Sequence, residues 1–241
     1  MERHRLIPLN QSVIIAADVS LDKFIALVHA TADVPGISGY KVGFSLGLRY
    51  SLPQVVEAVR KNDKTGRTRI IYDHQKAAND VPDLGSEFAS VCSDAGVDAV
   101  ILFPHAGPTT QTAWTKAAQD KGLHVLLGLH MTHPQYLNSE GGYVNDRAPR
   151  RALELAASMG VSDFVLPGNK VKFVKSYRRL LDKTLGFGNF DVYAPGFIAQ
   201  GGQISEYALE AGPLWHAIVG RGITLPPDMR AAAELNTVQF K

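Results

Sequence analysis

Residues 69–82 read RIIYDHQKAANDVP and join a short apolar run to a cluster of charged side chains. The run from Arg69 to Tyr72 is rich in β-branched and aromatic residues, which predicts a strand. The charged segment begins at Asp73, directly where that strand should end. An amphipathic stretch from Leu84 to Ala95 follows and predicts a helix. This order of strand, polar loop and helix is the unit from which parallel α/β sheets are built.

The same unit recurs along the chain. The predicted strands are Val13 to Ala17, Tyr40 to Val42, Arg69 to Tyr72, Ala99 to Leu102, Val125 to Leu129, Phe164 to Leu166, Val192 to Ala194 and Ala217 to Val219. The predicted helices include Leu52 to Val59, Leu84 to Ala95, Thr110 to Lys121, Arg147 to Met159, Lys170 to Leu181 and Ser205 to Ala211. Eight units in 241 residues predict one α/β domain over residues 1–241, a (β/α)8 TIM barrel. The alternative is an open doubly wound sheet, whose nucleotide-binding form has a Gly-x-Gly-x-x-Gly turn that Ala16 to Ser20 lacks.

Composition narrows the class of protein. The chain is 45% hydrophobic and 20% charged, as in an ordinary globular protein, and no apolar run approaches the roughly 20 residues of a membrane helix. The first residues lack the long apolar region of a signal peptide, so we expect a cytoplasmic protein without a membrane partner. A net charge of +2 argues against a nucleic-acid partner. The single cysteine, Cys92, cannot form an internal disulfide, and we expect it to be buried in a helix.

Polar residues that could act in catalysis follow most of the predicted strands. They are Asp18, Lys41, Asp73, Lys76, Asp80, His105, Thr132, His133, Gln200 and Arg221. Two carboxylates bracket Lys76, and opposite charges nearby favour the protonated form of a lysine. Lys76 is therefore suited to donate a proton rather than to act as a nucleophile. The alternative is a ladder of surface ion pairs with little energetic value.

Two glycine-rich segments predict a phosphate site. Residues 194–202 read APGFIAQGG, and residues 218–222 read IVGRG. Glycines let backbone N–H groups approach an anion closely, and the guanidinium of Arg221 can bind two phosphate oxygens at once. Both segments follow the last two predicted strands, where TIM barrels commonly hold phosphate.

Six segments between about residues 13 and 224 resemble, in order and position, the motifs of the orotidine 5'-phosphate decarboxylase family. They are Ala16-Ala17-Asp18, Tyr40-Lys41-Val42-Gly43, Asp73 with Lys76 and Asp80-Val81-Pro82, Met131-Thr132-His133-Pro134, Pro195-Gly196 with Ala199-Gln200-Gly201-Gly202, and Val219-Gly220-Arg221. The resemblance implies a homodimer with no cofactor that decarboxylates orotidine 5'-phosphate, a step of pyrimidine biosynthesis. Lys76 would protonate the pyrimidine carbon, Asp73 would lie beside the departing carboxylate, and Asp80 would reach the partner's site. The other implied contacts are Asp18 and Lys41 to ribose hydroxyls, Thr132 to the pyrimidine, and Gln200, Gly220 and Arg221 to the phosphate, with Pro195 and Gly201 in the same substrate-binding segments.

The central motif departs from the family in its spacing. The family has Asp-x-Lys-x-x-Asp, whereas Asp73, Lys76 and Asp80 are one residue further apart in each gap. Residues three apart on a regular strand point in opposite directions. Asp73 and Lys76 can therefore converge only if the backbone is irregular, which we predict at His74-Gln75.

Three alternatives remain open. One is a magnesium-dependent sugar-phosphate decarboxylase or aldolase of the same superfamily, although Lys41 would repel a divalent cation. Another is a phosphate-binding barrel without catalysis, which has no need of the charged cluster. His105, His130 and His133 could form a metal site, but metal sites usually add a carboxylate or cysteine. The long loop Pro134 to Tyr143 is either a lid over the site or a surface insertion.

Overall fold

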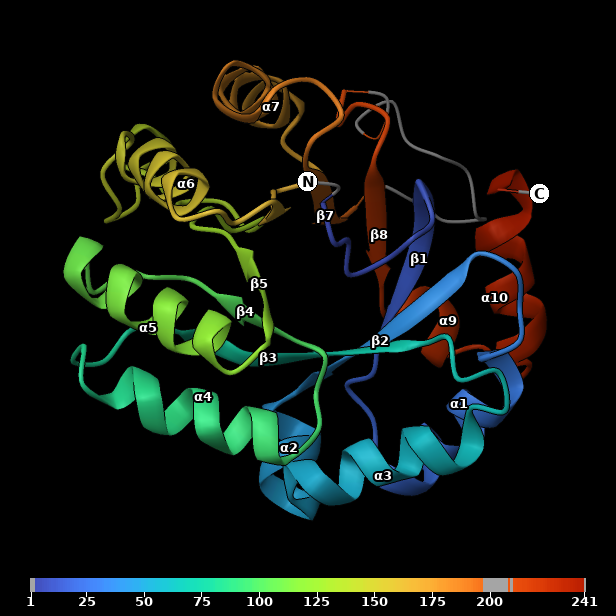
Figure 1. Cartoon of the computed structure of the whole chain (residues 1–241). Helices are drawn as coiled ribbons and strands as arrows, with labels where there is room; N and C mark the ends of the chain where they lie inside the picture. Colours follow the sequence, from blue (N-terminus) through green and yellow to red (C-terminus); the bar gives the residue numbers. More distant parts are fainter. Residues whose placement is uncertain (1–2, 197–207, 209, 241) are drawn as a thin grey trace.

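The chain forms a closed barrel of parallel strands surrounded by helices (Figure 1). A computed structural model describes residues 3–196, 208 and 210–240, and for Gln75 and Lys76 it describes the backbone only. Within these residues the strands follow one another around the barrel in sequence order, from β1 to β8, and β8 pairs with β1. The predicted (β/α)8 fold is therefore confirmed, and the open sheet is excluded.

The strands are β1 (Gln11–Ala16), β2 (Ile37–Gly43), β3 (Arg69–Ala77), β4 (Ala99–Leu102), β5 (His124–Leu127), β6 (Asp163–Val165), β7 (Asp191–Pro195) and β8 (Trp215–Val219). The helices are α1 (Leu21–Thr31), α2 (Phe44–Tyr50), α3 (Leu52–Asn62), α4 (Leu84–Asp94), α5 (Pro108–Asp120), η1 (Asn138–Glu140), α6 (Ala148–Ser158), α7 (Val171–Leu185), α9 (Arg221–Thr224), α10 (Met229–Thr237) and η2 (Val238–Phe240). Strand β4 matches its prediction at both ends. The predicted helix Ser205 to Ala211 lies mostly outside the described residues. No helix in the described ranges is both long and apolar enough to span a bilayer.

Alternation along the strands divides the core into two layers. Val13 and Ile15 belong to the large cluster between the barrel and its helices, whereas Ile14 belongs to a smaller cluster inside the barrel. Successive strand residues point to opposite faces, so each strand contributes to both layers. The inner cluster contains Leu6, Ile7, Ile14, Ile71, Ala99, Ile101, Phe103, Leu126, Val165 and Tyr193. Cys92 is buried in α4, as expected.

Strand β3 is irregular where the charged motif lies. Its pairing with β4 shifts register, so that four residues of β3 lie opposite the single residue Ile101. The pairs on either side of the shift are Tyr72 with Val100 and Ala77 with Leu102. The irregularity predicted at His74-Gln75 is thus confirmed. Ala78 follows with φ +70°, a left-handed conformation that costs a non-glycine residue energy and that often occurs at functional sites.

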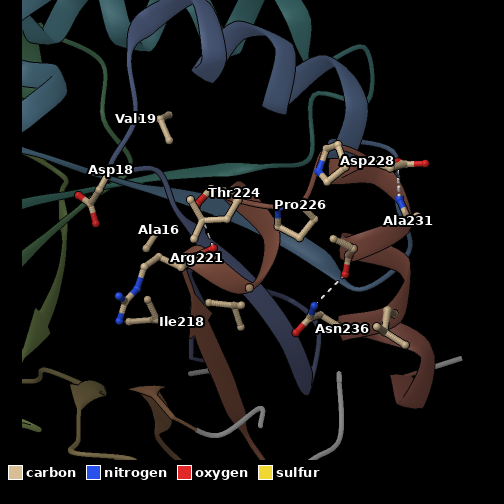
Figure 2. Close-up of a pocket in the computed structure, with 17 residues that line it drawn as sticks. Ala16, Asp18, Val19, Ile218, Arg221, Thr224, Pro226, Asp228, Ala231 and Asn236 are labelled. Atoms are coloured by element: carbon tan, nitrogen blue, oxygen red, sulfur yellow. Dashed lines mark hydrogen bonds between the residues drawn. The ribbon is translucent and has the colours of Figure 1, made fainter. Parts of the chain in front are cut away.

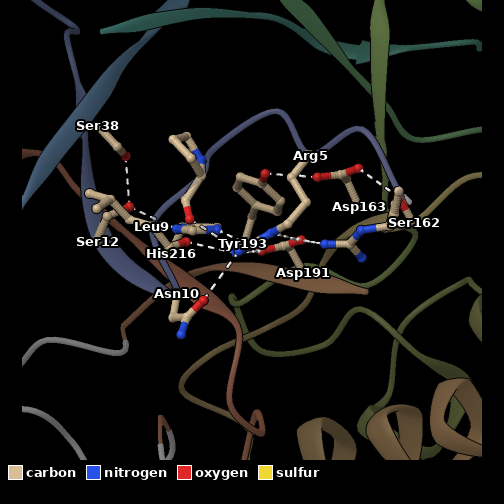
Figure 3. Close-up of polar contacts among 12 residues, drawn as sticks. Arg5, Leu9, Asn10, Ser12, Ser38, Ser162, Asp163, Asp191, Tyr193 and His216 are labelled. Carbon is tan, nitrogen blue, oxygen red and sulfur yellow. Dashed lines mark hydrogen bonds and ion pairs between the residues drawn. The ribbon is translucent and has the colours of Figure 1, made fainter. Parts of the chain in front are cut away.

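A buried polar network closes the end of the barrel where the strands begin, opposite the end that carries the charged motif of β3 (Figure 3). Arg5 donates to both carboxylate oxygens of Asp191, at 2.7 and 3.3 Å, and Arg3 also pairs with this carboxylate. His216 bonds to Asp191 through Nε2 at 3.0 Å and to Ser12 through Nδ1 at 2.7 Å. Burial lowers the pKa of His216 to about 3, and the positive charges of Arg5 and Arg3 add to this lowering, which the nearby Asp163 carboxylate opposes only in part. His216 is therefore neutral in the folded protein.

The neutral His216 predicts a loss of stability in mild acid. Its pKa is about 3 in the folded chain and 6.5 when unfolded, so between these values only the unfolded chain takes up the proton. The free energy of unfolding should fall as pH drops from about 6.5 toward 3, by on the order of 2–4 kcal/mol from this residue. Urea unfolding at a series of pH values measures it. His216→Gln should flatten the dependence, whereas His29→Gln, at an exposed site, should not. An unchanged pH slope in His216→Gln would contradict the assignment.

Candidate active site

A cavity of about 260 Å³ lies at the carboxyl ends of the strands. Its walls combine charged residues with apolar ones, as expected for a site that holds a small molecule with a flat apolar part. The lining residues are Ala16, Asp18, Lys41, Asp73, Ile101, Phe103, His130, Met131, Thr132, Val165, Leu166, Pro195, Ile218 and Gly220. Five of the predicted site residues therefore share this cavity with Lys41: Asp18, Asp73, Thr132, Pro195 and Gly220.

Lys41 and Asp73 form an ion pair in the cavity wall, with 2.9 Å between Nζ and Oδ2. Asp73 lies opposite Gly43 in the pairing of β2 with β3, and Lys41 is two residues before Gly43 on the same face. The side chains of Lys41 and Asp73 are 10% and 19% exposed. At such depth their attraction is screened less than on the surface. The pair places one fixed positive and one fixed negative charge against any ligand in the cavity.

A second, larger cavity of about 1300 Å³ adjoins the first and shares Ala16, Asp18, Ile218 and Gly220 with it (Figure 2). Arg221, the first residue of α9, lines it, and its guanidinium extends toward the side where Asp18 and Ile218 lie. Arg221 is exposed, and none of the carboxylates in the described ranges pairs with it. An exposed guanidinium beside a cavity can bind an anion without first breaking contacts to other side chains.

Three predicted site residues cannot be assigned to either cavity. The side chain of Lys76, and all of Gln200 and Gly201, lie outside the described residues. Asp80 is exposed and is not among the described residues that line either cavity; its carboxylate accepts the backbone N–H of Val81 at 2.7 Å. Within one chain, the described carboxylates of the 260 Å³ cavity are thus Asp18 and Asp73.

The three histidines considered as an alternative metal site do not come together around one point. Nδ1 of His130 bonds to the hydroxyl of Tyr177 at 2.9 Å, and Nε2 of His105 bonds to the hydroxyl of Tyr136. His133 is exposed and packs edge-on against Tyr136. Among the described residues, no three histidine, cysteine, aspartate or glutamate side chains are grouped closely enough to hold a metal ion.

His130 lines the 260 Å³ cavity, although its sequence context pointed only to a possible metal ligand. It is 3% exposed, and burial together with the nearby Lys170 lowers its pKa to about 4. A neutral imidazole therefore forms part of the wall. The sequence could have indicated this position, because His130 is two residues before Thr132 and residues two apart in an extended segment share a face.

Comparison with known proteins connects this geometry to a family. Residues 11–235 match the family described as "Orotidine 5'-phosphate decarboxylase / HUMPS family". Orotidine 5'-phosphate decarboxylase of Thermoplasma volcanium is 26% identical over 216 residues, which is 89% of this chain and 86% of that protein. The enzyme of the same name from Methanosarcina barkeri is 29% identical over 224 residues, 92% of this chain and 90% of that protein.

Solved structures show the same fold. Orotidine 5'-monophosphate decarboxylase from Methanocaldococcus jannaschii, in complex with the inhibitor BMP, superposes with a TM-score of 0.76 at 21% identity, covering 94% of this chain and 96% of that one. Orotidine 5'-phosphate decarboxylase from Pyrococcus horikoshii superposes with a TM-score of 0.73 at 26% identity, covering 92% and 95%.

Proposed function

The chain belongs to the orotidine 5'-phosphate decarboxylase / HUMPS family, and from that premise we propose that it converts orotidine 5'-phosphate to uridine 5'-phosphate. The activity makes it a carboxy-lyase of pyrimidine biosynthesis, as the relatives' names indicate. The observation that carries the proposal is the Lys41–Asp73 ion pair in a cavity lined by apolar residues. Fixed charges beside an apolar wall suit a ligand with an aromatic ring and a charged substituent.

The chemical step breaks the bond between the pyrimidine ring and its carboxylate. The bonding electrons stay on the ring carbon as carbon dioxide leaves, and Lys76 then donates a proton to that carbon. A positive charge placed before the reaction stabilises the developing carbanion without reorganisation. Asp73, held by Lys41, would lie beside the substrate carboxylate and disfavour the ground state. Remote phosphate contacts would offset that unfavourable placement.

We propose that no metal or organic cofactor takes part. Lys41 Nζ lies 2.9 Å from Asp73, so it already neutralises the carboxylate that a magnesium ion would need and repels the ion itself. This favours the nucleotide over the sugar-phosphate substrates of the superfamily. The deciding experiment follows the pyrimidine absorbance of orotidine 5'-phosphate mixed with the protein in chelator. Conversion to uridine 5'-phosphate is expected, and no conversion, or conversion only with added magnesium, would refute the proposal.

The phosphate is proposed to lie with Arg221 and Gly220, and with Gln200 and Gly201 of the segment outside the described residues. Replacing Arg221 by methionine removes a charged bidentate contact remote from the reacting carbon. KM should rise by about 100-fold, with a smaller change in kcat at saturation. Steady-state kinetics with Arg221→Met and Arg230→Met measure this, since Arg230 is also exposed but sits on α10. Equal KM values for Arg221→Met and the wild type would exclude Arg221 from the phosphate site.

We further propose a homodimer in which Asp80 completes the partner's site. Asp80 is exposed, and Val81 and Leu84 beside it are exposed apolar residues, as are Phe44 and Leu48 after the neighbouring strand β2. Apolar residues at the carboxyl ends of adjacent strands indicate a covered surface.

Subunit mixing tests the shared aspartate. Lys76→Met and Asp80→Asn should each be nearly inactive alone. In a mixed dimer, one site would combine intact Lys76 with intact Asp80, because the two come from different chains. Mixing equal amounts after reversible dissociation should restore about a quarter of the wild-type activity. If mixing restores no activity although sedimentation shows mixed dimers, Asp80 acts within its own subunit or not at all.

A further inference from the structure

The loop between β5 and α6 carries Thr132 and is held against the barrel by three side chains, His130, Glu140 and Lys170. Lys170 Nζ lies 2.6 Å from Glu140 Oε1 and 3.1 Å from His130 Nε2. The Lys170 and Glu140 side chains are 13% and 19% exposed, and that of His130 is 2% exposed. A lysine just before α7, a glutamate in the loop and a histidine of the cavity wall thus meet in one contact.

The hydrogen-bonding capacity of each side chain fixes which atom donates and which accepts in this contact. A lysine ammonium can only donate, so Nε2 of His130 accepts and its Nδ1–H donates to the Tyr177 hydroxyl. The ring is also packed face to face with Tyr136 and edge-on against Phe173. His130 therefore has no alternative orientation that preserves its partners. Lys170 is fixed in turn between the His130 ring and the Glu140 carboxylate.

The contact continues into the backbone on both sides of Thr132. Glu140 accepts the backbone N–H groups of Tyr136 and Leu137, at 3.3 and 3.1 Å. Asn169, next to Lys170, donates to the backbone carbonyl of Thr132 at 3.1 Å. Leu137 is fully buried. The segment that carries Thr132 is thus anchored at His130, at Thr132 and at Glu140.

We propose that His130, Glu140 and Lys170 form a latch that positions Thr132 against the base of the bound nucleotide, so that they are positioning residues for recognition of the pyrimidine. This inference rests on the proposed function, because it assigns the base to the part of the cavity beside Thr132. The latch stands apart from Arg221, which lines the larger cavity and not the one that holds His130 and Thr132. Its loss should weaken binding of the base half of the ligand and leave the ribose phosphate half unaffected.

Two ligands separate the base from the ribose phosphate: the whole product, and the product without its base. Dissociation constants of uridine 5'-phosphate and ribose 5-phosphate are measured by calorimetry for the wild type, Lys170→Met, Lys170→Arg and Lys172→Met. Lys172 is exposed and lies outside the latch, so its replacement is the matched control. Lys170→Met should weaken uridine 5'-phosphate by about tenfold, within the range that positioning residues contribute, and change ribose 5-phosphate less than about twofold. Lys170→Arg keeps the charge and should behave as the wild type. The KM for orotidine 5'-phosphate should rise in parallel with the uridine 5'-phosphate constant.

The outcomes distinguish the latch from the proposed function. A wild type that neither binds uridine 5'-phosphate nor converts orotidine 5'-phosphate refutes the function. A wild type that does both, with Lys170→Met equal to it, or with Lys170→Met losing both ligands equally, overturns the latch. If Lys170→Met does not fold, Glu140→Gln carries the same comparison, since its remaining carbonyl oxygen can still accept the backbone N–H groups.

Discussion

Replacing Lys41 by methionine is expected to lower kcat/KM for orotidine 5'-phosphate by about 10³-fold, the upper end of the effect seen when one preorganised hydrogen-bond donor is lost from an active site. Lys41 is the described partner of Asp73, at 2.9 Å in a largely buried setting. Without it the negative charge of Asp73 is left in the cavity wall with less compensation, and it repels the substrate carboxylate more strongly. Single-turnover measurement of the absorbance change separates this loss from product release.

A double-mutant cycle tests whether Lys41 and Asp73 act as a pair. Asp73→Asn alone should also lower the rate of the chemical step, and the double variant should be far less impaired than the product of the two single effects. Lys64→Met, at an exposed site before β3, serves as the control for loss of one positive charge. Additive effects in the cycle would show that the two residues act separately, and an unchanged chemical step in Asp73→Asn would remove its proposed role.

Lys76→Met should have the largest effect, a fall in kcat of about 10⁴-fold, because it removes both the proton donor and the positive charge at the reacting carbon. Binding of uridine 5'-phosphate should change little, since the product no longer needs a proton. Rapid-quench kinetics in deuterated and ordinary water give the chemical step and its isotope effect. A Lys76→Met variant with a rate within about tenfold of the wild type would require another donor.

The fold could be predicted because its signals are local. Short β-branched runs alternate with amphipathic stretches, and eight such units leave few compact arrangements other than a closed barrel. The grouping of several candidate site residues followed from the same reasoning. The carboxyl ends of parallel strands meet at one rim, so Asp18, Lys41, Asp73 and Thr132 had to converge wherever the strands closed. The cavity confirms that convergence.

The amino-acid sequence by itself determined the barrel, its order of strands and the rim that carries the charged residues. Hydrophobic periodicity and the ends of strands depend on residues that are neighbours in the chain, so both can be recognised in the sequence. Only the tertiary structure decided which side chains from distant parts of the barrel pair with one another. Glu140 meets Lys170 across 30 positions, and Arg5 meets Asp191 across 186. The register shift of β3 was expected, but its extent depends on how β4 pairs with it. Such contacts arise when the barrel closes and burial makes an unpaired charge costly, which no local pattern encodes.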